Sequence, residues 1–131
     1  PILPTLTALE QWLRAVYAPF GPQTDATWRH LTETSWRRTD AGQITVHYDP
    51  RLVDHLTAQP GDWDQWAAYD RIRCPTLLLR GQTSDVLTRE TAAAMTRRGP
   101  GGRLVEIEDC GHAPMLNTII EQQVIDEFLA S

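Results

Sequence analysis

The chain has 131 residues, of which 41% are hydrophobic, and this is enough for the core of one domain. The formal net charge is −5 and the basic residues form no cluster, which argues against nucleic acid, whose phosphates need grouped Lys and Arg side chains. No segment reaches the roughly 18 apolar residues of a membrane span, and no signal peptide opens the chain, so we expect a cytoplasmic protein without membrane contact.

Residues 1–68 predict a layer of helices and contain all five tryptophans. A first helix is expected from Thr7, which would form a capping box with Glu10, to a stop at Pro19. A second is expected from Thr24 to Arg38, followed by a turn at residues 40–42. No buried strand is predicted in this part of the chain.

Two further helical segments complete this layer. Asp49-Pro50 is a good N-terminal cap followed by proline at the first helical position. The helix that follows would place Leu52, Val53 and Leu56 on its inner side and would end at residues 59–61. A short helical turn around Trp63 and Trp66 then leads to Tyr69.

From residue 69 onward the pattern becomes strand, helix, strand, helix. The run at residues 76–79 lacks polar alternation, as expected of a strand covered on both faces of a parallel sheet, and Gly81 ends it. Thr88 caps a helix of about ten residues, and residues 103–107 form the second strand. A crossover of this length predicts parallel pairing. Asn117 is expected to cap a last helix with an apolar stripe of Ile120, Val124, Ile125, Phe128 and Leu129.

An acid and an imidazole follow the ends of these two strands. Asp85 comes shortly after the first strand and His112 shortly after the second. Because parallel strands bring the loops at their carboxyl ends to one edge of the sheet, we expect the two side chains to converge there. A nucleophilic catalytic triad consists of an acid, a histidine that the acid orients, and a nucleophile. Asp85 and His112 are therefore the candidate acid and base of such a triad.

These residues resemble the C-terminal part of an α/β-hydrolase. The resemblance rests on residues 72–81 (IRCPTLLLRG), on Ser84-Asp85 and on residues 111–114 (GHAP). It implies that Asp85 is the triad acid and His112 the triad base. Residues 1–68 resemble the helical cap of such enzymes, with residues 42–50 returning towards the core. The fold class is therefore expected to be α/β, as a partial α/β-hydrolase: a cap at 1–68 and, at 69–131, a parallel strand-helix-strand-helix part of the core.

The sequence departs from the family pattern because it contains no G-x-S-x-G turn to supply the serine. Since the chain starts on Pro1, we interpret it as a fragment of a longer protein. We expect its partner to be its own N-terminal half, which would carry the nucleophile and the oxyanion hole. Two parallel strands do not make a stable sheet, so we expect a lone chain to form a homodimer through the exposed strand edge. A compact monomer by light scattering at micromolar concentration would contradict this.

Other residues near the candidate site have alternative interpretations. Asp109 is a competing carboxylate, but it lies in the same tight loop as His112 and is a poor partner for the far ring nitrogen. Cys110 could be a thiol nucleophile, although a small buried residue is the favoured interpretation. The two cysteines lie at opposite ends of the sheet and should be free thiols. The histidines show no metal-ligand spacing, so we expect neither metal nor cofactor, and a surface or cap role for His30, His47 and His55.

The predicted function is that of a serine-type hydrolase fragment, inactive alone, whose parent enzyme cleaves small, fairly apolar esters or related acyl substrates. Two alternatives stay open: a non-catalytic oligomerising module derived from the fold, and a small-ligand-binding domain that uses the tryptophan-rich cap. The sequence alone does not choose the substrate, because specificity depends on the shape of a pocket.

Overall fold

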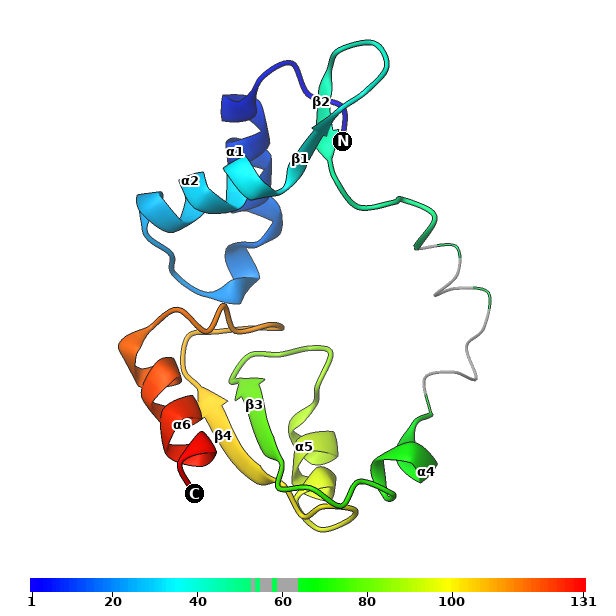
Figure 1. Ribbon diagram of the computed structural model, residues 1–131, viewed down its shortest axis with the longest axis vertical. Coiled ribbons are helices and arrows are strands. Elements are labelled where there is room, and N and C mark those ends of the chain that lie inside the picture. The colour runs from blue at the N-terminus through cyan, green and yellow to red at the C-terminus, as the bar shows by residue number, and fades with distance from the viewer. Residues whose placement is uncertain (53, 55–57, 59–63) are drawn as a thin grey trace. The chain divides into compact units, whose positions relative to one another are not determined.

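The computed structural model describes residues 1–52, 54, 58 and 64–131 and divides into two compact units (Figure 1). The first unit comprises Pro1–Ala18 and Pro22–Trp63, and the second comprises Pro19–Gly21 and Asp64–Ser131. The division therefore falls a few residues before the predicted boundary at residue 69. Among the described residues, no helix combines the length and the apolar composition needed to cross a bilayer.

The first unit consists of two helices and a hairpin. The helices α1 (Leu6–Val16) and α2 (Asp25–Thr34) pack on each other, and the strands β1 (Trp36–Arg38) and β2 (Ile44–Val46) pair antiparallel. Leu9 and Leu13 are fully buried because their i, i+4 spacing places both on one face of α1. The other buried members of this core are Trp28, Ile44 and Val46.

The hairpin corrects the prediction that a helix continues to Arg38 and that the first part of the chain has no strand. Helix α2 ends at Thr34, because the amide of Ser35 donates to the carbonyl oxygen of Thr32 instead of continuing the i to i−4 pattern of the helix. The predicted turn at residues 40–42 exists, but it joins two strands, and Gly42 has the positive φ of 78° that this turn requires. Strands of three residues are too short to show a periodicity in the sequence.

The N-terminal cap of α1 is Thr5 rather than the predicted Thr7, since the Thr5 hydroxyl accepts from the amide of Ala8 at 3.1 Å. We predict that Thr5→Ala lowers the free energy of unfolding by about 1 kcal/mol, because the amide loses its partner. Thr7→Ala, at an exposed position inside the same helix, is the matched control and should change it by less than about 0.5 kcal/mol. Urea unfolding followed by tryptophan fluorescence measures both, and a larger loss for Thr7→Ala would contradict the assignment.

The second unit confirms the predicted parallel strand-helix-strand-helix order. Strand β3 (Leu77–Gly81) pairs in parallel with β4 (Arg103–Ile107), in a register that places Gly81 opposite Ile107. Helix α5 (Arg89–Met95) connects them and begins after Thr88, as predicted, but it is shorter than expected. The short helix α4 (Trp66–Tyr69) precedes β3, and the Tyr69 hydroxyl donates to the carbonyl oxygen of Met95 at 2.9 Å.

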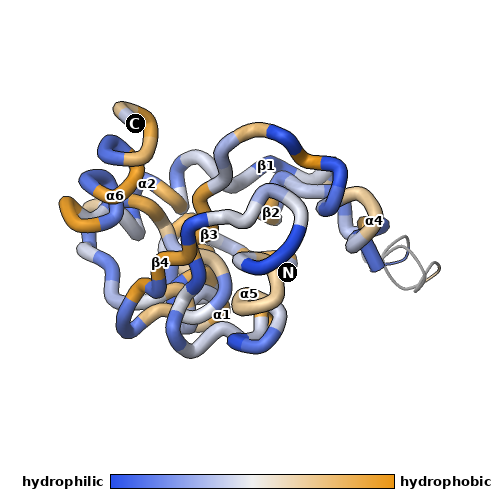
Figure 2. Tube along the Cα trace, turned by 90° about the horizontal axis from the view of Figure 1, so that it is seen from below, coloured by the Kyte–Doolittle hydropathy of each residue, from blue (hydrophilic) through white to orange (hydrophobic). Residues whose placement is uncertain are grey.

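Helix α6 (Ile119–Leu129) closes the chain (Figure 1). Its cap is Thr118, one residue after the predicted Asn117, and Thr118 forms a capping box with the buried Glu121. Hydrophobic and hydrophilic positions alternate along this helix (Figure 2). Of the predicted stripe, Val124, Ile125 and Phe128 are half-buried, whereas Ile120 and Leu129 are 71% and 75% exposed.

Of the expected third helix after Asp49-Pro50, residues 52, 54 and 58 are helical. Val53 and Leu56, which were predicted on its inner side, lie outside the described residues, and so does Trp63 of the predicted helical turn.

Candidate active site

Two loops leave the carboxyl ends of the paired strands. We call residues 82–88, after β3, the acid loop, and residues 108–118, after β4, the histidine loop. The amide of Gln82 donates to the carbonyl oxygen of Ile107 at 2.8 Å. The amide and the hydroxyl of Thr83 both donate to the carbonyl oxygen of Cys110, each at 3.0 Å. The two loops therefore lie side by side at one edge of the sheet.

Asp85 lies two residues after Thr83, and His112 lies two residues after Cys110. Both side chains are exposed. Within the described part of the chain, neither forms a hydrogen bond or an ion pair, with the other or with any third group. The direct pairing of Asp85 with His112 therefore stays a prediction, and what the structure provides is the adjacency of the loops that carry them.

Two glycines allow the histidine loop to pack this closely. A Cβ atom on Gly81 would lie 1.9 Å from the carbonyl oxygen of Gly111, far inside any van der Waals distance. A Cβ atom on Gly111 would lie 2.6 Å from the carbonyl oxygen of Pro19, which accepts the Gly111 amide at 2.6 Å. The loop is thus held between the end of β3 and the short 3-10 helix η1 (Ala18–Phe20). Gly81 therefore ends the strand, as predicted, and its missing side chain also leaves room for the histidine loop.

Cys110 is a structural residue of this loop. Its Sγ atom is buried and lies 3.3 Å from the carbonyl oxygens of Phe20 and Gly111. Burial raises the pKa of the Cys110 thiol, and the negative charge of Glu121 raises it further. An activated thiol needs the opposite shift, because the thiolate is the nucleophile. These observations favour the small buried residue over the thiol nucleophile. Cys74 is exposed, and both cysteines are free.

The competing acid, Asp109, lies in the histidine loop. Asp109 is exposed and adopts a left-handed backbone conformation with φ of 51° in the turn after β4. His30 and His47 are exposed in the first unit, and His55 lies outside the described residues. Among the described His, Cys, Asp and Glu residues, no group of three or more could hold a metal ion.

A model described as the alpha/beta hydrolase family matches residues 2–121 of this chain. The chain belongs to the alpha/beta hydrolase family. The structural match extends over both units: a putative hydrolase from Rickettsia typhi aligns over 99% of the chain with a TM-score of 0.82 and 27% identity. An alpha/beta hydrolase from Novosphingobium aromaticivorans also aligns over 99% of the chain, with a TM-score of 0.80 and 29% identity.

Curated relatives of this alpha/beta hydrolase chain are hydrolases. A 3-hydroxybutyrate-oligomer hydrolase from Cupriavidus necator is 37% identical over 79% of the chain, and this match covers 38% of the relative. A pimeloyl-[acyl-carrier protein] methyl ester esterase from Aromatoleum aromaticum is 38% identical over 43% of the chain and 22% of the relative. The chain spans less than half the length of these proteins, and 44% and 47% of the two solved structures.

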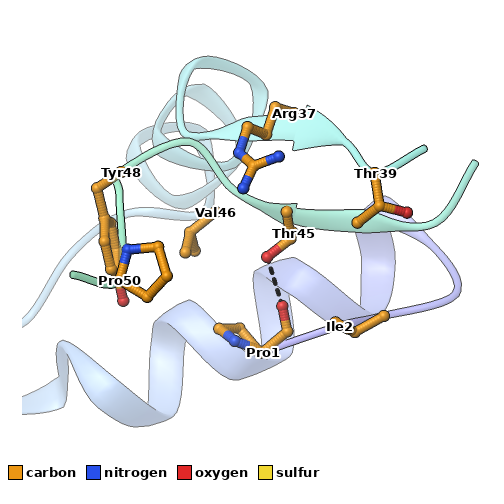
Figure 3. A pocket seen from close by; sticks show the side chains of 8 residues that line it. All are labelled: Pro1, Ile2, Arg37, Thr39, Thr45, Val46, Tyr48 and Pro50. Atoms are coloured by element: carbon orange, nitrogen blue, oxygen red, sulfur yellow. Dashed lines mark hydrogen bonds between the residues drawn. The ribbon is translucent and has the colours of Figure 1, made fainter. Parts of the chain in front are cut away.

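The first unit has a pocket of about 360 Å³ beside β2, shown in Figure 3. The Thr45 hydroxyl donates to the carbonyl oxygen of Pro1 at 2.6 Å at one side of it. Its lining includes the charged side chain of Arg37. The described residues of the lining are Pro1, Ile2, Arg37, Thr39, Thr45, Val46, Tyr48 and Pro50. The described residues of the lining include neither a carboxylate nor an imidazole, so the acid and histidine loops are the better candidate for chemistry.

Sequence reasoning missed Arg80, which follows three leucines in β3. Its side chain is only 5% exposed although it carries a charge. The sequence does contain a signal for its role, because a charged residue at the end of an otherwise apolar, buried run needs hydrogen-bond partners.

Proposed function

We propose that this chain supplies the acid and the base of a serine hydrolase that cleaves small, fairly apolar esters or related acyl substrates. One observation carries the proposal: the paired hydrogen bonds from Thr83 to Cys110, which bring the loops of Asp85 and His112 together at the carboxyl ends of two parallel strands. The names of the two curated relatives, an oligomer hydrolase and a methyl ester esterase, support an acyl substrate.

In the proposed reaction His112 acts first as a general base. It takes the proton of a serine hydroxyl as the oxygen attacks the carbonyl carbon of the ester, and Asp85 holds the ring and stabilises the imidazolium that forms. His112 then returns the proton to the leaving alkoxide, and a water molecule repeats the sequence to release the acid. Backbone amides would stabilise the negative oxygen of the intermediate.

The serine and those amides have to come from residues other than the ones in this sequence, which has no G-x-S-x-G turn. We propose that they belong to the preceding half of the same protein, since the curated relatives are more than twice as long as the matched part. In that protein the first unit would form part of the cap. Ile119 and Ile120, which are 74% and 71% exposed, would be covered by that half.

The test is ester hydrolysis by the complete gene product. We expect saturable cleavage of p-nitrophenyl esters with short acyl chains, and covalent labelling by a fluorophosphonate probe at a serine outside the 131 residues. The 131-residue chain alone should do neither. Failure of the complete protein to cleave any ester or to react with the probe would contradict the proposal and favour the non-catalytic module.

A further inference from the structure

Arg80 is a buried cation at the end of β3, just before the acid loop. Its guanidinium donates hydrogen bonds to four acceptors. Nε donates to the carbonyl oxygen of Leu87 at 2.7 Å, and a terminal nitrogen donates to that of Ser84 at 3.2 Å. The other terminal nitrogen donates to the carbonyl oxygen of Gln82 at 3.0 Å and to Oε1 of Glu106 at 2.8 Å. Three of the four acceptors are therefore backbone groups of the acid loop.

These contacts bracket Asp85 without touching its carboxylate. Ser84 directly precedes Asp85, and Leu87 follows it by two residues, so the guanidinium holds the chain on both sides of the acid. The same turn is closed from within, because the Ser84 hydroxyl accepts from the amide of Leu87 at 3.1 Å. Glu106 of β4 anchors the cation from the neighbouring strand. The backbone on either side of Asp85 is thereby fixed, while its side chain stays exposed.

We propose that Arg80 is a positioning residue for Asp85, a proposal that rests on the proposed function. A buried charge contributes little to stability in comparison with an apolar side chain of similar volume, so stability alone does not account for an arginine in this strand. What the guanidinium provides is a planar set of donors with fixed directions that can reach several oxygens at once. Lysine carries the same charge but is a single point donor on a flexible stem, and it would not span the acid loop in this way.

The proposal predicts a specific effect of Arg80→Lys in the complete protein. We expect kcat for ester hydrolysis to fall by about 10²-fold with KM nearly unchanged, since a displacement of about 1 Å at a catalytic group has an effect of this size. Arg103→Lys is the matched control, because Arg103 is an exposed arginine at the start of β4 whose contact is Glu127 at 3.6 Å, and it should leave kcat unchanged. Thermal unfolding of each variant shows whether the assays are made on folded protein.

A double-mutant cycle separates positioning from a general structural role. If Arg80 acts through Asp85, then Arg80→Lys should change kcat by less than about 2-fold in an Asp85→Asn background, because coupled residues are not additive. An equal loss in both backgrounds, or no loss in the wild type, would overturn the role of Arg80. An Asp85→Asn variant with full activity would instead overturn the proposed function itself. If Arg80→Lys does not fold, Glu106→Gln replaces it in the cycle, because it weakens the hydrogen bond to the same guanidinium. The results that support or overturn the role of Arg80 are then the same.

Discussion

Replacing His112 by alanine in the complete protein is expected to reduce kcat for ester hydrolysis by about 10⁴- to 10⁶-fold, the range found when a triad histidine or acid is removed from serine hydrolases. The physical reason is that the serine hydroxyl then has no general base to take its proton. KM should change little, because the imidazole acts mainly in the transition state. Steady-state kinetics with a p-nitrophenyl ester measures both constants.

The structure makes this substitution a clean test. His112 is exposed and forms no hydrogen bond or ion pair among the described residues, so its loss should change the free energy of unfolding by less than about 0.5 kcal/mol. His30→Ala, at an exposed position in α2, is the control and should keep full activity. Activity within a few-fold of wild type in His112→Ala would remove this residue from the reaction.

Gly81→Ala is expected to destabilise the protein and to lower its activity as well. The added methyl group would lie 1.9 Å from the carbonyl oxygen of Gly111 and 2.5 Å from that of Cys110, and both are backbone atoms that cannot turn away. The histidine loop must therefore shift, at a cost of about 1–3 kcal/mol or more in unfolding free energy. Because the shift displaces the loop that carries His112, we expect kcat to fall by about 10²-fold as well.

Gly42→Ala distinguishes this loop displacement from a general effect of alanine at a glycine. Gly42 has open space around its Cβ position, but its φ of 78° is costly for alanine, by about 1–2 kcal/mol. Both variants should therefore be less stable by urea unfolding, whereas only Gly81→Ala should lose activity under folding conditions. Equal activity of the two variants would show that the contact between Gly81 and Gly111 does not position the site.

The sequence was sufficient to predict the second unit because its signals are local. The apolar run at residues 76–79 between Pro75 and Gly81, the cap at Thr88 and the length of the crossover together specify parallel strands with both loops at one edge. The same reasoning placed Asp85 and His112 on those loops. The adjacency of the two loops follows from the direction of the strands alone, so it can be predicted without knowledge of any side-chain contact.

The features that escaped prediction depend on partners far along the chain. Cys110 packs against Phe20, 90 positions away, and nothing in the residues around Pro19 indicates that a carbonyl there receives the histidine loop. The hairpin of β1 and β2 is formed from strands too short to show alternation, and its stability comes from packing on α1. Arg80 stands out in the sequence as a charge at the end of an apolar run, but three of its four acceptors are backbone carbonyls, and the sequence does not indicate which carbonyls it reaches.

The central claim is that Asp85 and His112 act as one unit on adjacent loops, and a double-mutant cycle in the complete protein tests it most directly. We expect Asp85→Asn alone to lower kcat by about 10⁴-fold and His112→Ala alone to lower it at least as much. The double variant should then be no slower than His112→Ala, because an acid that works by orienting a histidine has nothing left to orient. Losses that multiply in the double variant, or full activity of Asp85→Asn, would contradict the claim.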